Sequence, residues 1–348
     1  MTDLLALTAT LVDIPSVSLH ERAIADHIEA VLRDVPWLGV DRVGDNVVAR
    51  TDLGRSQRLI LAGHTDTVPV NDNDRARIEG DVLWGLGSCD MKGGVAVFLE
   101  LARTVSEPAV DVSFVFYTAE EIAAEHSGLL QLFRERPDLL AGDAAVLGEP
   151  TGATIEAGCQ GTMRARVTLA GQRAHTARPW MGVNAIHRLG SVLADLDAYE
   201  ARRPVLDGCE FREAVQAVHV EGGVAGNVVP DRATVTLNHR FAPDRDAAAA
   251  EAHLRSLVHQ KEGDTFEVLD VAPGAPPSMK HPLLAALGRG RVVRAKLGWT
   301  DVARFFEHGI PACNFGPGDP TIAHTRDEHV TRSEIDAVHT ALLEVLTA

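Results

Sequence analysis

Three short apolar runs within the first 150 residues most constrain the fold of this chain. They are RLILAG (58–63), VDVSFVFYTA (110–119) and AAVLG (144–148). Each run is continuous rather than alternating, which is typical of strands buried on both faces of a sheet. Helical patterns lie between them, including GGVAVFLELARTV (93–105). Strands that alternate with helices predict a doubly wound, mostly parallel sheet of the α/β class.

A further helix is expected near the N-terminus, in SLHERAIADHIEAVL (18–32). Ser18 and Glu21 have the Ser-x-x-Glu spacing of a capping box, and a helical apolar pattern follows them. We therefore predict that these two side chains cap this helix.

The chain is long enough for two hydrophobic cores, and its middle has a pattern of its own. It has 348 residues, more than a single core usually serves. The segment TMRARVTLAG (162–171) alternates like a half-exposed strand, and helix, strand, strand, helix and strand patterns follow it. That order is ferredoxin-like. We therefore expect an inserted α+β domain over residues 162–275, and a larger α/β domain from residues 1–161 and 276–348.

Charge and cysteine content indicate the class of protein and its compartment. With 33 basic and 49 acidic residues, the formal net charge is −16. A chain this acidic should repel nucleic acid and anionic membranes, so we expect neither as a partner. The N-terminus lacks the basic region of a signal peptide, no apolar run has membrane-spanning length, and the four cysteines form no paired motif. We therefore expect a cytoplasmic protein with reduced thiols.

Metal-ligand residue types follow each of the three apolar runs. His64 and Asp66 follow the first run, Glu120 and Glu121 the second, and Glu149 the third. Because ligands bind at the carboxyl ends of strands in open α/β sheets, we expect these side chains to converge on one crevice. Several carboxylates at one sheet edge repel one another unless a cation holds them. Imidazole and carboxylate together suit Zn²⁺ or a similar divalent ion.

Two further segments carry candidate ligands. Asp90 lies in the glycine-rich GLGSCDMKGG, which allows close backbone approach just before a helix. A second imidazole comes from IAHTRDEHV, which offers His324 and His329. We prefer His324 because it comes sooner after the loop NFGPGDP and is followed by a polar turn.

Each of these residues also has a purely structural interpretation. His64 could be an ordinary hydrogen-bonded histidine, Asp90 a helix N-cap and Glu149 a loop residue. Glu120 and Glu121 could open a solvated helix, because acids favour the first turn. For single residues these interpretations are favoured, whereas the set as a whole favours a metal site.

Eight motifs together carry a resemblance to a known family. In chain order they are GHTDTVP, GLGSCDMKGG, YTAEE, GEPT, RAHTARPWMGVNAIH, GGVAGNVVPD, WTDVARF and AHTRDEHV. As a set they resemble the M20 family of di-zinc amidohydrolases and peptidases over nearly the whole chain. CQGTMRARV, AHTARPWMGVNAIH and GWTDVARF are most similar to the branch of succinyl-diaminopimelate desuccinylases. The resemblance implies a zinc-bearing α/β domain and an inserted domain through which two copies dimerise.

The resemblance also implies the metal ligands. Asp90 would bridge two Zn²⁺ ions, for which Co²⁺ or Mn²⁺ are alternatives. His64 and Glu149 would complete the protein ligands of one ion. Glu121 and His324 would complete those of the other ion.

Three further residues take catalytic roles by the same resemblance. Glu120 would be the general base rather than a ligand. Asp66 would fix the tautomer of His64. His175, in the inserted domain, would reach the site of the partner subunit and hydrogen-bond the developing oxyanion.

Four residues are candidates for binding substrate. Arg178 and Arg240 are suited to gripping carboxylates, although Arg178 could instead only support its loop. Asn227 offers a polar contact, and Thr300 in GWTDVARF could touch the substrate. Relatives often have Gly-Gly-Thr at this last position, so Trp299 departs from the pattern and puts the shape of the pocket in question.

The resemblance implies hydrolysis of an amide N-acyl bond, with N-succinyl-LL-diaminopimelate as first choice of substrate. N-acetylornithine deacetylase, general N-acyl-amino-acid amidohydrolase and dipeptidase are the alternatives within that class. A non-catalytic metal or amino-acid binding protein is the rival from another class. Glu120 argues against that rival, because a pure binding protein has no use for an acid that binds no metal. A third hypothesis, a structural protein that dimerises through the inserted domain, leaves the acids at the strand ends unexplained.

Overall fold

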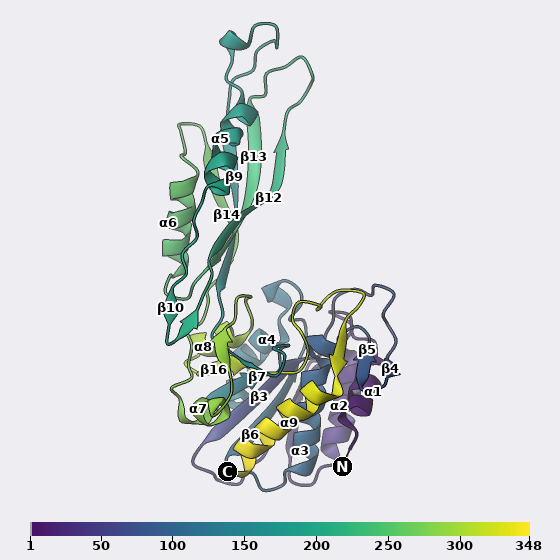
Figure 1. Cartoon of the computed structure of the whole chain (residues 1–348). Helices are drawn as coiled ribbons and strands as arrows, with labels where there is room; N and C mark the ends of the chain where they lie inside the picture. Colours follow the sequence, from purple (N-terminus) through teal and green to yellow (C-terminus); the bar gives the residue numbers. More distant parts are fainter. Residues whose placement is uncertain (1) are drawn as a thin grey trace. The chain divides into compact units, whose positions relative to one another are not determined.

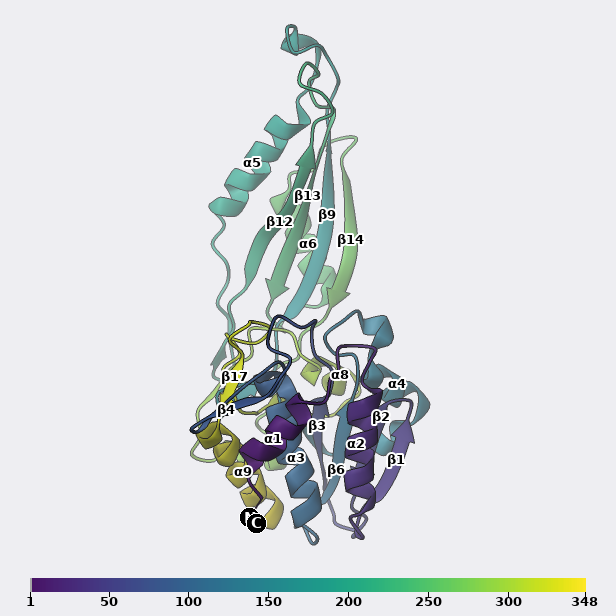
Figure 2. The same cartoon turned by 90° about the vertical axis from the view of Figure 1, so that its right-hand side faces the viewer.

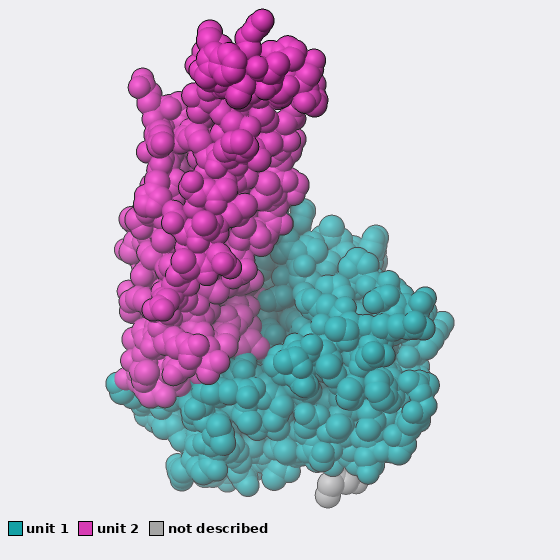
Figure 3. All heavy atoms as spheres, turned by 45° about the horizontal axis from the view of Figure 1, so that its top comes forward, with its two compact units in different colours: residues 1–157, 277–294, 304–348 teal, residues 158–276, 295–303 magenta. Residues whose placement is uncertain are grey.

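The computed structural model describes residues 2–348, and the chain divides into two compact units, coloured separately in Figure 3. Unit 1 comprises Met1–Ala157, Pro277–Arg294 and Arg304–Ala348. Unit 2 comprises Gly158–Pro276 and Ala295–Ala303. Across residues 2–348, no helix combines the length and the apolar character needed to cross a bilayer.

Unit 1 is built on an eight-stranded sheet, visible in Figures 1 and 2. Its order is β1-β2-β6-β3-β7-β16-β8-β15. The four central strands, β6, β3, β7 and β16, are parallel, which confirms the predicted mostly parallel sheet. The strands are β1 (Gly39–Val43), β2 (Asn46–Arg50), β3 (Arg58–His64), β6 (Asp111–Tyr117), β7 (Ala144–Leu147), β8 (Ile155–Ala157), β15 (Val293–Ala295) and β16 (Ala312–Asn314).

The central strands are buried on both faces, as their continuous apolar runs predict. Leu59 and Leu61 of β3 belong to a core cluster that also contains side chains of α1, α2, α3, α7 and α9. Ile60 and Ala62, which alternate with them and face the other side, are fully buried as well. The helices are α1 (Leu4–Val12), α2 (Arg22–Arg33), α3 (Gly93–Thr104), α4 (Gly128–Glu135), α7 (Pro282–Gly288), α8 (Val302–Glu307) and α9 (Arg332–Thr347).

Smaller elements complete unit 1. An antiparallel hairpin, β1 and β2, lies at one edge of the sheet and was not predicted, although Gly44 with a φ of 61° gives it a two-residue turn. A separate three-stranded sheet has the order β17-β5-β4. Its strands are β4 (Arg77–Glu79), β5 (Val82–Trp84) and β17 (His329–Thr331), and short helical turns cover Ser88–Lys92, Ala124–His126 and Pro137–Leu140.

The predicted capping box of α2 is wrong. The helix begins at Arg22, and neither Ser18 nor Glu21 makes a side-chain capping hydrogen bond to it. Both side chains are bound to distant parts of the chain instead, as the site below shows. A capping box does form at α9, where Thr331 and Glu334 bond reciprocally.

Unit 2 has the predicted order of strand, helix, strand, strand, helix and strand. Its antiparallel sheet has the order β12-β13-β9-β14. Alternate residues of β9 are buried, as its alternating sequence predicts, and they form one core with α5 and α6. The elements are β9 (Gly161–Ala170), α5 (Ala185–Asp197), β12 (Ala214–Gly222), β13 (Arg232–Phe241), α6 (Ala247–Leu257) and β14 (Thr265–Ala272), with a turn at Pro179–Met181 and a small hairpin of β10 (Val205–Leu206) and β11 (Cys209–Glu210).

Candidate metal centre

Three parallel neighbours of the unit 1 sheet bring acids and an imidazole to one edge. His64 is the last residue of β3 and pairs with Tyr117, the last residue of β6. On the other side, Ala62 pairs with Leu147 of β7. Two residues beyond that pair, each of the two segments carries a candidate ligand: His64 in the first and Glu149 in the second. The shared direction of the strands is therefore what gathers these side chains.

The carboxylate of Asp90 lies between two imidazoles. Its Oδ1 is 3.2 Å from Nε2 of His64, and its Oδ2 is 3.3 Å from Nε2 of His324. The same nitrogen of His324 is 2.8 Å from Oε1 of Glu121. Ligand atoms of His64, Asp90 and Glu121 all lie within 4.8 Å of one another. A different imidazole therefore lies at each oxygen of the Asp90 carboxylate.

The charges around these side chains favour a positive charge on both imidazoles. Burial lowers the pKa of His64, but hydrogen bonds and charges from Asp66 and Asp90 outweigh burial and raise that pKa well above its usual value. Hydrogen bonds to Asp90 and Glu121 raise the pKa of His324 to about 10. The pKa of Asp90 is lowered despite its burial, because His324 and His64 bond its ionised form. The same excess of carboxylate that favours protonated imidazoles favours a divalent cation.

The donor set fits a zinc-type ion. Imidazole nitrogen and carboxylate oxygen are ligands that Zn²⁺ accepts, and Co²⁺ or Mn²⁺ accept the same types. His64, Asp90 and Glu121 are the group that could share an ion, and His324 contacts two of them. Glu149 is 5% exposed and lies two residues beyond the end of β7. The structure therefore gathers His64, Glu121 and His324 around the Asp90 carboxylate.

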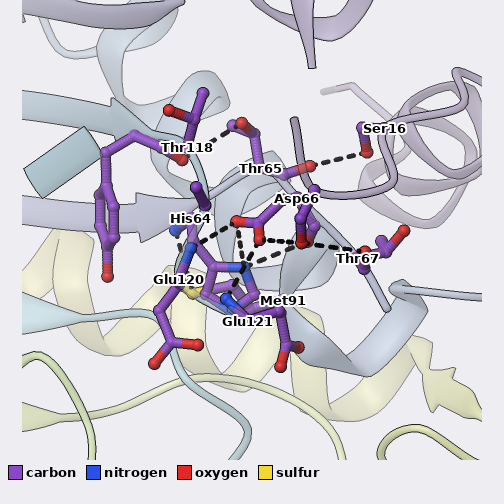
Figure 4. Close-up of polar contacts among 12 residues, drawn as sticks. Ser16, His64, Thr65, Asp66, Thr67, Met91, Thr118, Glu120 and Glu121 are labelled. Atoms are coloured by element: carbon purple, nitrogen blue, oxygen red, sulfur yellow. Dashed lines mark hydrogen bonds and ion pairs between the residues drawn. The ribbon is translucent and has the colours of Figure 1, made fainter. Parts of the chain in front are cut away.

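Asp66 fixes the segment that carries the two adjacent glutamates. Its carboxylate accepts the backbone N–H groups of Glu120 at 3.0 Å and Glu121 at 3.1 Å, and the hydroxyl of Ser18 at 2.8 Å. Figure 4 shows the bonds of Asp66 to Glu120 and Glu121, with both glutamate side chains extending away from Asp66. Nδ1 of His64 lies 3.5 Å from Oδ1 of Asp66 and 3.2 Å from its backbone oxygen. A single buried carboxylate thus orients the backbone of two candidate site residues and one imidazole.

Glu21 extends this arrangement by one residue. Its Oε1 accepts the N–H of Ala119 at 3.0 Å, and its side chain is almost fully buried. Ala119 has a φ of 56°, so this turn needs support from outside. Two carboxylates, Glu21 and Asp66, therefore hold three successive N–H groups that begin two residues after β6.

The adjacent acids do not begin a helix. Glu120 and Glu121 are half-buried, and the next α-helix, α4, begins at Gly128 with Ser127 as its cap. Asp90 makes no capping hydrogen bond, since the residue before α3 is Lys92 and no side chain caps that helix. The helix-start and N-cap interpretations are therefore wrong for these residues.

The Asp90 turn is held from the C-terminal side of the chain. Glu328, 1% exposed, accepts the N–H groups of Cys89 at 3.2 Å and Asp90 at 3.1 Å. Burial raises the pKa of Glu328 to about 7 and lowers that of nearby Lys92 to about 8. The Lys92 ammonium donates to the backbone oxygen of Ile14 at 2.9 Å.

Cys89 is a buried free thiol whose pKa is raised by burial, which agrees with a packing role.

Neither Glu328 nor the site roles of Ser18 and Glu21 were predicted from the sequence. The only local signal at Ser18 and Glu21 is their Ser-x-x-Glu spacing, which indicates a helix capping box and not a role at this site. His329, the alternative to His324, contacts Trp84 with ring centroids 4.3 Å apart and the rings tilted by 37°.

Glycines allow the ligand-bearing backbone to approach α3 closely. A Cβ at Gly94 would overlap the carbonyl oxygen of Gly148, the residue before Glu149. A Cβ at Gly316 would overlap the same oxygen. The chain around Glu149 is therefore packed backbone against backbone, which fixes its position.

The five other predicted site residues lie in unit 2. Arg240 is half-buried in β13, where burial lowers its pKa, and no ion pair or hydrogen bond of its guanidinium is found among residues 2–348. The ring of His175 accepts the N–H of Ala177 at 3.0 Å, and Arg178 is exposed in the same loop. Asn227 is exposed, with its backbone oxygen bound to Thr176. Thr300 is buried.

Comparison with known proteins identifies the family. The model of peptidase family M20/M25/M40 matches residues 60–348. The chain belongs to this family. Among M20 relatives, it is 52% identical over 338 residues to the protein assigned as succinyl-diaminopimelate desuccinylase DapE in Mycobacterium tuberculosis, covering 96% of this chain and 95% of that protein. It is 45% identical to the succinyl-diaminopimelate desuccinylase of Corynebacterium glutamicum, covering 99% and 96%.

Solved structures of the M20 family share the fold. Aminopeptidase PepT from Bacillus cereus matches with a TM-score of 0.80 at 19% identity, covering 99% of this chain and 97% of that chain. The YXEP protein of Bacillus subtilis, described as a dinuclear metal-binding peptidase from the M20 family, matches with a TM-score of 0.73 at 17% identity, covering 99% and 96%.

Proposed function

We propose that the chain is a metal-dependent amidohydrolase that hydrolyses N-succinyl-LL-diaminopimelate to succinate and LL-diaminopimelate, a step of lysine and diaminopimelate biosynthesis. The observation that carries the hydrolase is the Asp90 carboxylate between two imidazoles, with Glu121 beside one of them. The succinyl substrate is supported by the names of the relatives at 45% and 52% identity.

The proposed cofactor is a pair of Zn²⁺ ions, with Co²⁺ or Mn²⁺ as alternatives. Asp90 would bind both ions, His64 and Glu149 one of them, and Glu121 and His324 the other. When bound, such ions supply Lewis-acid activation of water and of the acyl carbonyl. The donor types and the excess of buried acids support this assignment.

Glu120 is the proposed general base. It would accept the proton of the attacking water and pass it to the leaving amine. Its backbone N–H is fixed by Asp66, so the base and the neighbouring ligand Glu121 are held on one rigid turn. Proton transfer depends on such positioning, because the acid must lie within hydrogen-bond reach of the water.

The proposed substrate contacts belong to unit 2. Arg240 has a guanidinium suited to bidentate binding of a carboxylate, and its partial burial, which lowers its pKa although the charge of Asp270 opposes this, supports the role. Arg178, Asn227 and Thr300 are the other proposed contacts. His175 would donate to the developing oxyanion in the partner subunit, an interaction worth about 3–4 kcal/mol in comparable sites.

The remaining proposals concern assembly and location. Residues 1–161 and 276–348 would form the catalytic domain, and residues 162–275 the dimerisation domain of a homodimer. An exposed edge strand, β12, supports dimerisation. Four buried, free cysteines support a cytoplasmic location, and nucleic acid and membranes are not expected as partners. Sedimentation of the protein should therefore give twice the chain mass.

The test is amine release from N-succinyl-LL-diaminopimelate and N-acetylornithine by metal-stripped protein, with and without added Zn²⁺. We expect Zn²⁺ to restore activity on the succinyl substrate, and Glu120→Gln to lower kcat about 10²–10⁴-fold, the usual contribution of a general base. Glu125→Gln, an exposed acid four residues beyond Glu121, is the control and should keep full activity.

Other outcomes separate the alternatives. Activity on the acetyl substrate alone would keep the hydrolase and reject the succinyl substrate. Full activity of Glu120→Gln would reject the proposed base. No hydrolysis of either compound, or of a panel of acyl-amino acids and dipeptides, by protein that binds Zn²⁺ would favour a binding protein.

A further inference from the structure

The two segments that carry Asp90 and His324 are far apart in the chain, yet both must be placed against the same ions. Asp90 lies in the turn Ser88–Lys92, where its own φ of −119° and ψ of 92° are not helical. His324 lies in a loop before β17 and has a φ of 62°. Neither ligand is therefore placed by regular secondary structure alone.

Glu328 joins these two segments. It follows His324 by four residues, and its Oε1 accepts the N–H groups of Cys89 and Asp90 at 3.2 and 3.1 Å. Its backbone oxygen also accepts the N–H of Gly85 at 3.1 Å. One residue thus binds the Asp90 turn through its side chain, and through its main chain the segment three residues before that turn.

The surrounding strands reinforce this connection. The segment after Glu328 forms β17, which pairs with β5 just before the Asp90 turn. The side chain of Asn73 donates to the backbone oxygen of Thr325 at 3.1 Å. Because Glu328 is 1% exposed, water cannot readily replace its two accepted hydrogen bonds.

We propose that Glu328 is a positioning residue that keeps the Asp90 carboxylate in register with His324, so that both can bind the same ion. This proposal rests on the metal centre proposed above. Residues that orient ligands without touching the metal typically change metal affinity or activity about 10–100-fold when mutated. The role depends on the reach of the Glu328 carboxylate to two N–H groups, not on its charge.

Asp111 provides a matched control. It is 3% exposed and also accepts two backbone N–H groups, those of Leu53 at 2.8 Å and Arg55 at 2.9 Å. It lies at the first residue of β6, at the opposite end of that strand from Glu120 and Glu121. Asp111 also accepts the hydroxyl of Thr51 at 2.9 Å, so its removal costs the fold several hydrogen bonds, as removal of Glu328 does, but only Glu328 holds a candidate ligand.

The experiment measures Zn²⁺ affinity by competition with a chromophoric chelator, together with thermal unfolding of the metal-free protein. We expect Glu328→Ala to bind Zn²⁺ about 10–100-fold more weakly than the wild type. Asp111→Ala should unfold at a lower temperature yet bind Zn²⁺ like the wild type. Equal affinity of Glu328→Ala and wild type would overturn the proposal.

Two conservative variants separate reach from charge and remain useful should Glu328→Ala not fold. Glu328→Asp keeps the charge but is one methylene too short, whereas Glu328→Gln keeps the length and an acceptor oxygen. We expect weaker Zn²⁺ binding and an altered Co²⁺ absorption spectrum for Glu328→Asp, and near-wild-type values for Glu328→Gln. A loss in Glu328→Gln as large as in Glu328→Asp would contradict a positioning role. A wild type that binds no Zn²⁺ would reject the proposed metal centre itself.

Discussion

The sheets of the two units expose their strands in opposite ways. In unit 1, six of the seven residues of β3 are buried, and every candidate ligand lies at or beyond a strand end or in a loop. In unit 2, β9 is buried only at alternate residues, and Arg240 lies within β13 itself. A sheet that is buried on both faces by apolar side chains can carry polar site residues only at the ends of its strands or in loops. A sheet with one exposed face can also carry them within a strand.

Both units bury carboxylates that accept backbone N–H groups, and unit 2 also buries an imidazole whose pKa is lowered. In unit 1, Asp66, Asp111 and Glu328 each accept at least two backbone N–H groups. In unit 2, His239 is fully buried in β13 beside the rings of Phe241 and His253. The three carboxylates hold backbone N–H groups in place, whereas burial lowers the pKa of His239 and favours its neutral form, so the two units should respond to different perturbations.

The largest effect is expected from Asp66→Ala in unit 1. The substitution leaves two buried N–H donors without their acceptor, at about 1–3 kcal/mol each, so the free energy of unfolding should fall by about 2–6 kcal/mol. Amide hydrolysis should be lost together with Zn²⁺ affinity, because Glu120, Glu121 and His64 all lose their support. Denaturant unfolding and the amine-release assay measure both effects. Ser18→Ala, which removes one hydroxyl donor, should cost only about 1 kcal/mol. Unchanged stability of Asp66→Ala would show that the turn after β6 holds itself.

A pH response is expected from unit 2. Burial lowers the pKa of His239 to about 4, so between pH 6.5 and 4 the unfolded chain takes up a proton that the folded chain does not. The contribution to stability is therefore full above pH 6.5 and is lost as the pH falls to 4, by at most about 3 kcal/mol. His253 adds a loss of the same sign, since burial and Arg245 lower its pKa. His239→Leu should flatten the dependence of unfolding free energy on pH. An identical pH profile for the variant and the wild type would show that protonation of His239 does not cause the loss of stability.

A pair of glycine substitutions should act with opposite sign in the two units. Gly94→Ala places a Cβ against the carbonyl oxygen of Gly148, and overpacking of this kind costs about 1–3 kcal/mol. Gly190→Ala, within α5, meets nothing within 4 Å and should stabilise by about 0.5–1 kcal/mol. The melting temperatures of the two variants test this prediction. Shifts of the same sign would contradict the difference in packing between Gly94, which is crowded, and Gly190, which is not.

The smallest effect on folding is expected at the exposed edge of unit 2. Val220 of β12 is 50% exposed, so Val220→Lys should change the free energy of unfolding by less than about 0.5 kcal/mol. It should nevertheless dissociate the proposed homodimer, because charged residues protect sheet edges from pairing. Val271→Lys, on the opposite edge strand β14, is the control and should keep the dimer. Analytical ultracentrifugation distinguishes the species, and a Val220→Lys variant that stays dimeric would place the interface elsewhere.

Local sequence patterns were sufficient for much of the fold. The continuous run at 58–63 and the alternating run at 162–171 predicted a buried and a half-exposed strand, and both predictions are confirmed. The edge hairpin of β1 and β2 was missed, since its short strands give little periodic signal. The apolar pattern predicted strand burial because the residues that form one face of a strand are alternate residues of the same short segment.

The sequence by itself therefore determined the α/β class, the parallel centre of the sheet and the ligand-type residues after its strands. Only the tertiary structure decided what the polar side chains bind. Ser18 and Glu21 have the same spacing as Thr331 and Glu334, yet only the second pair caps a helix. The N–H bound by Glu21 lies 98 positions away, and the Asp90 N–H bound by Glu328 lies 238 positions away. A buried carboxylate binds whichever donor the fold brings to it, and no pattern of neighbouring residues records that donor.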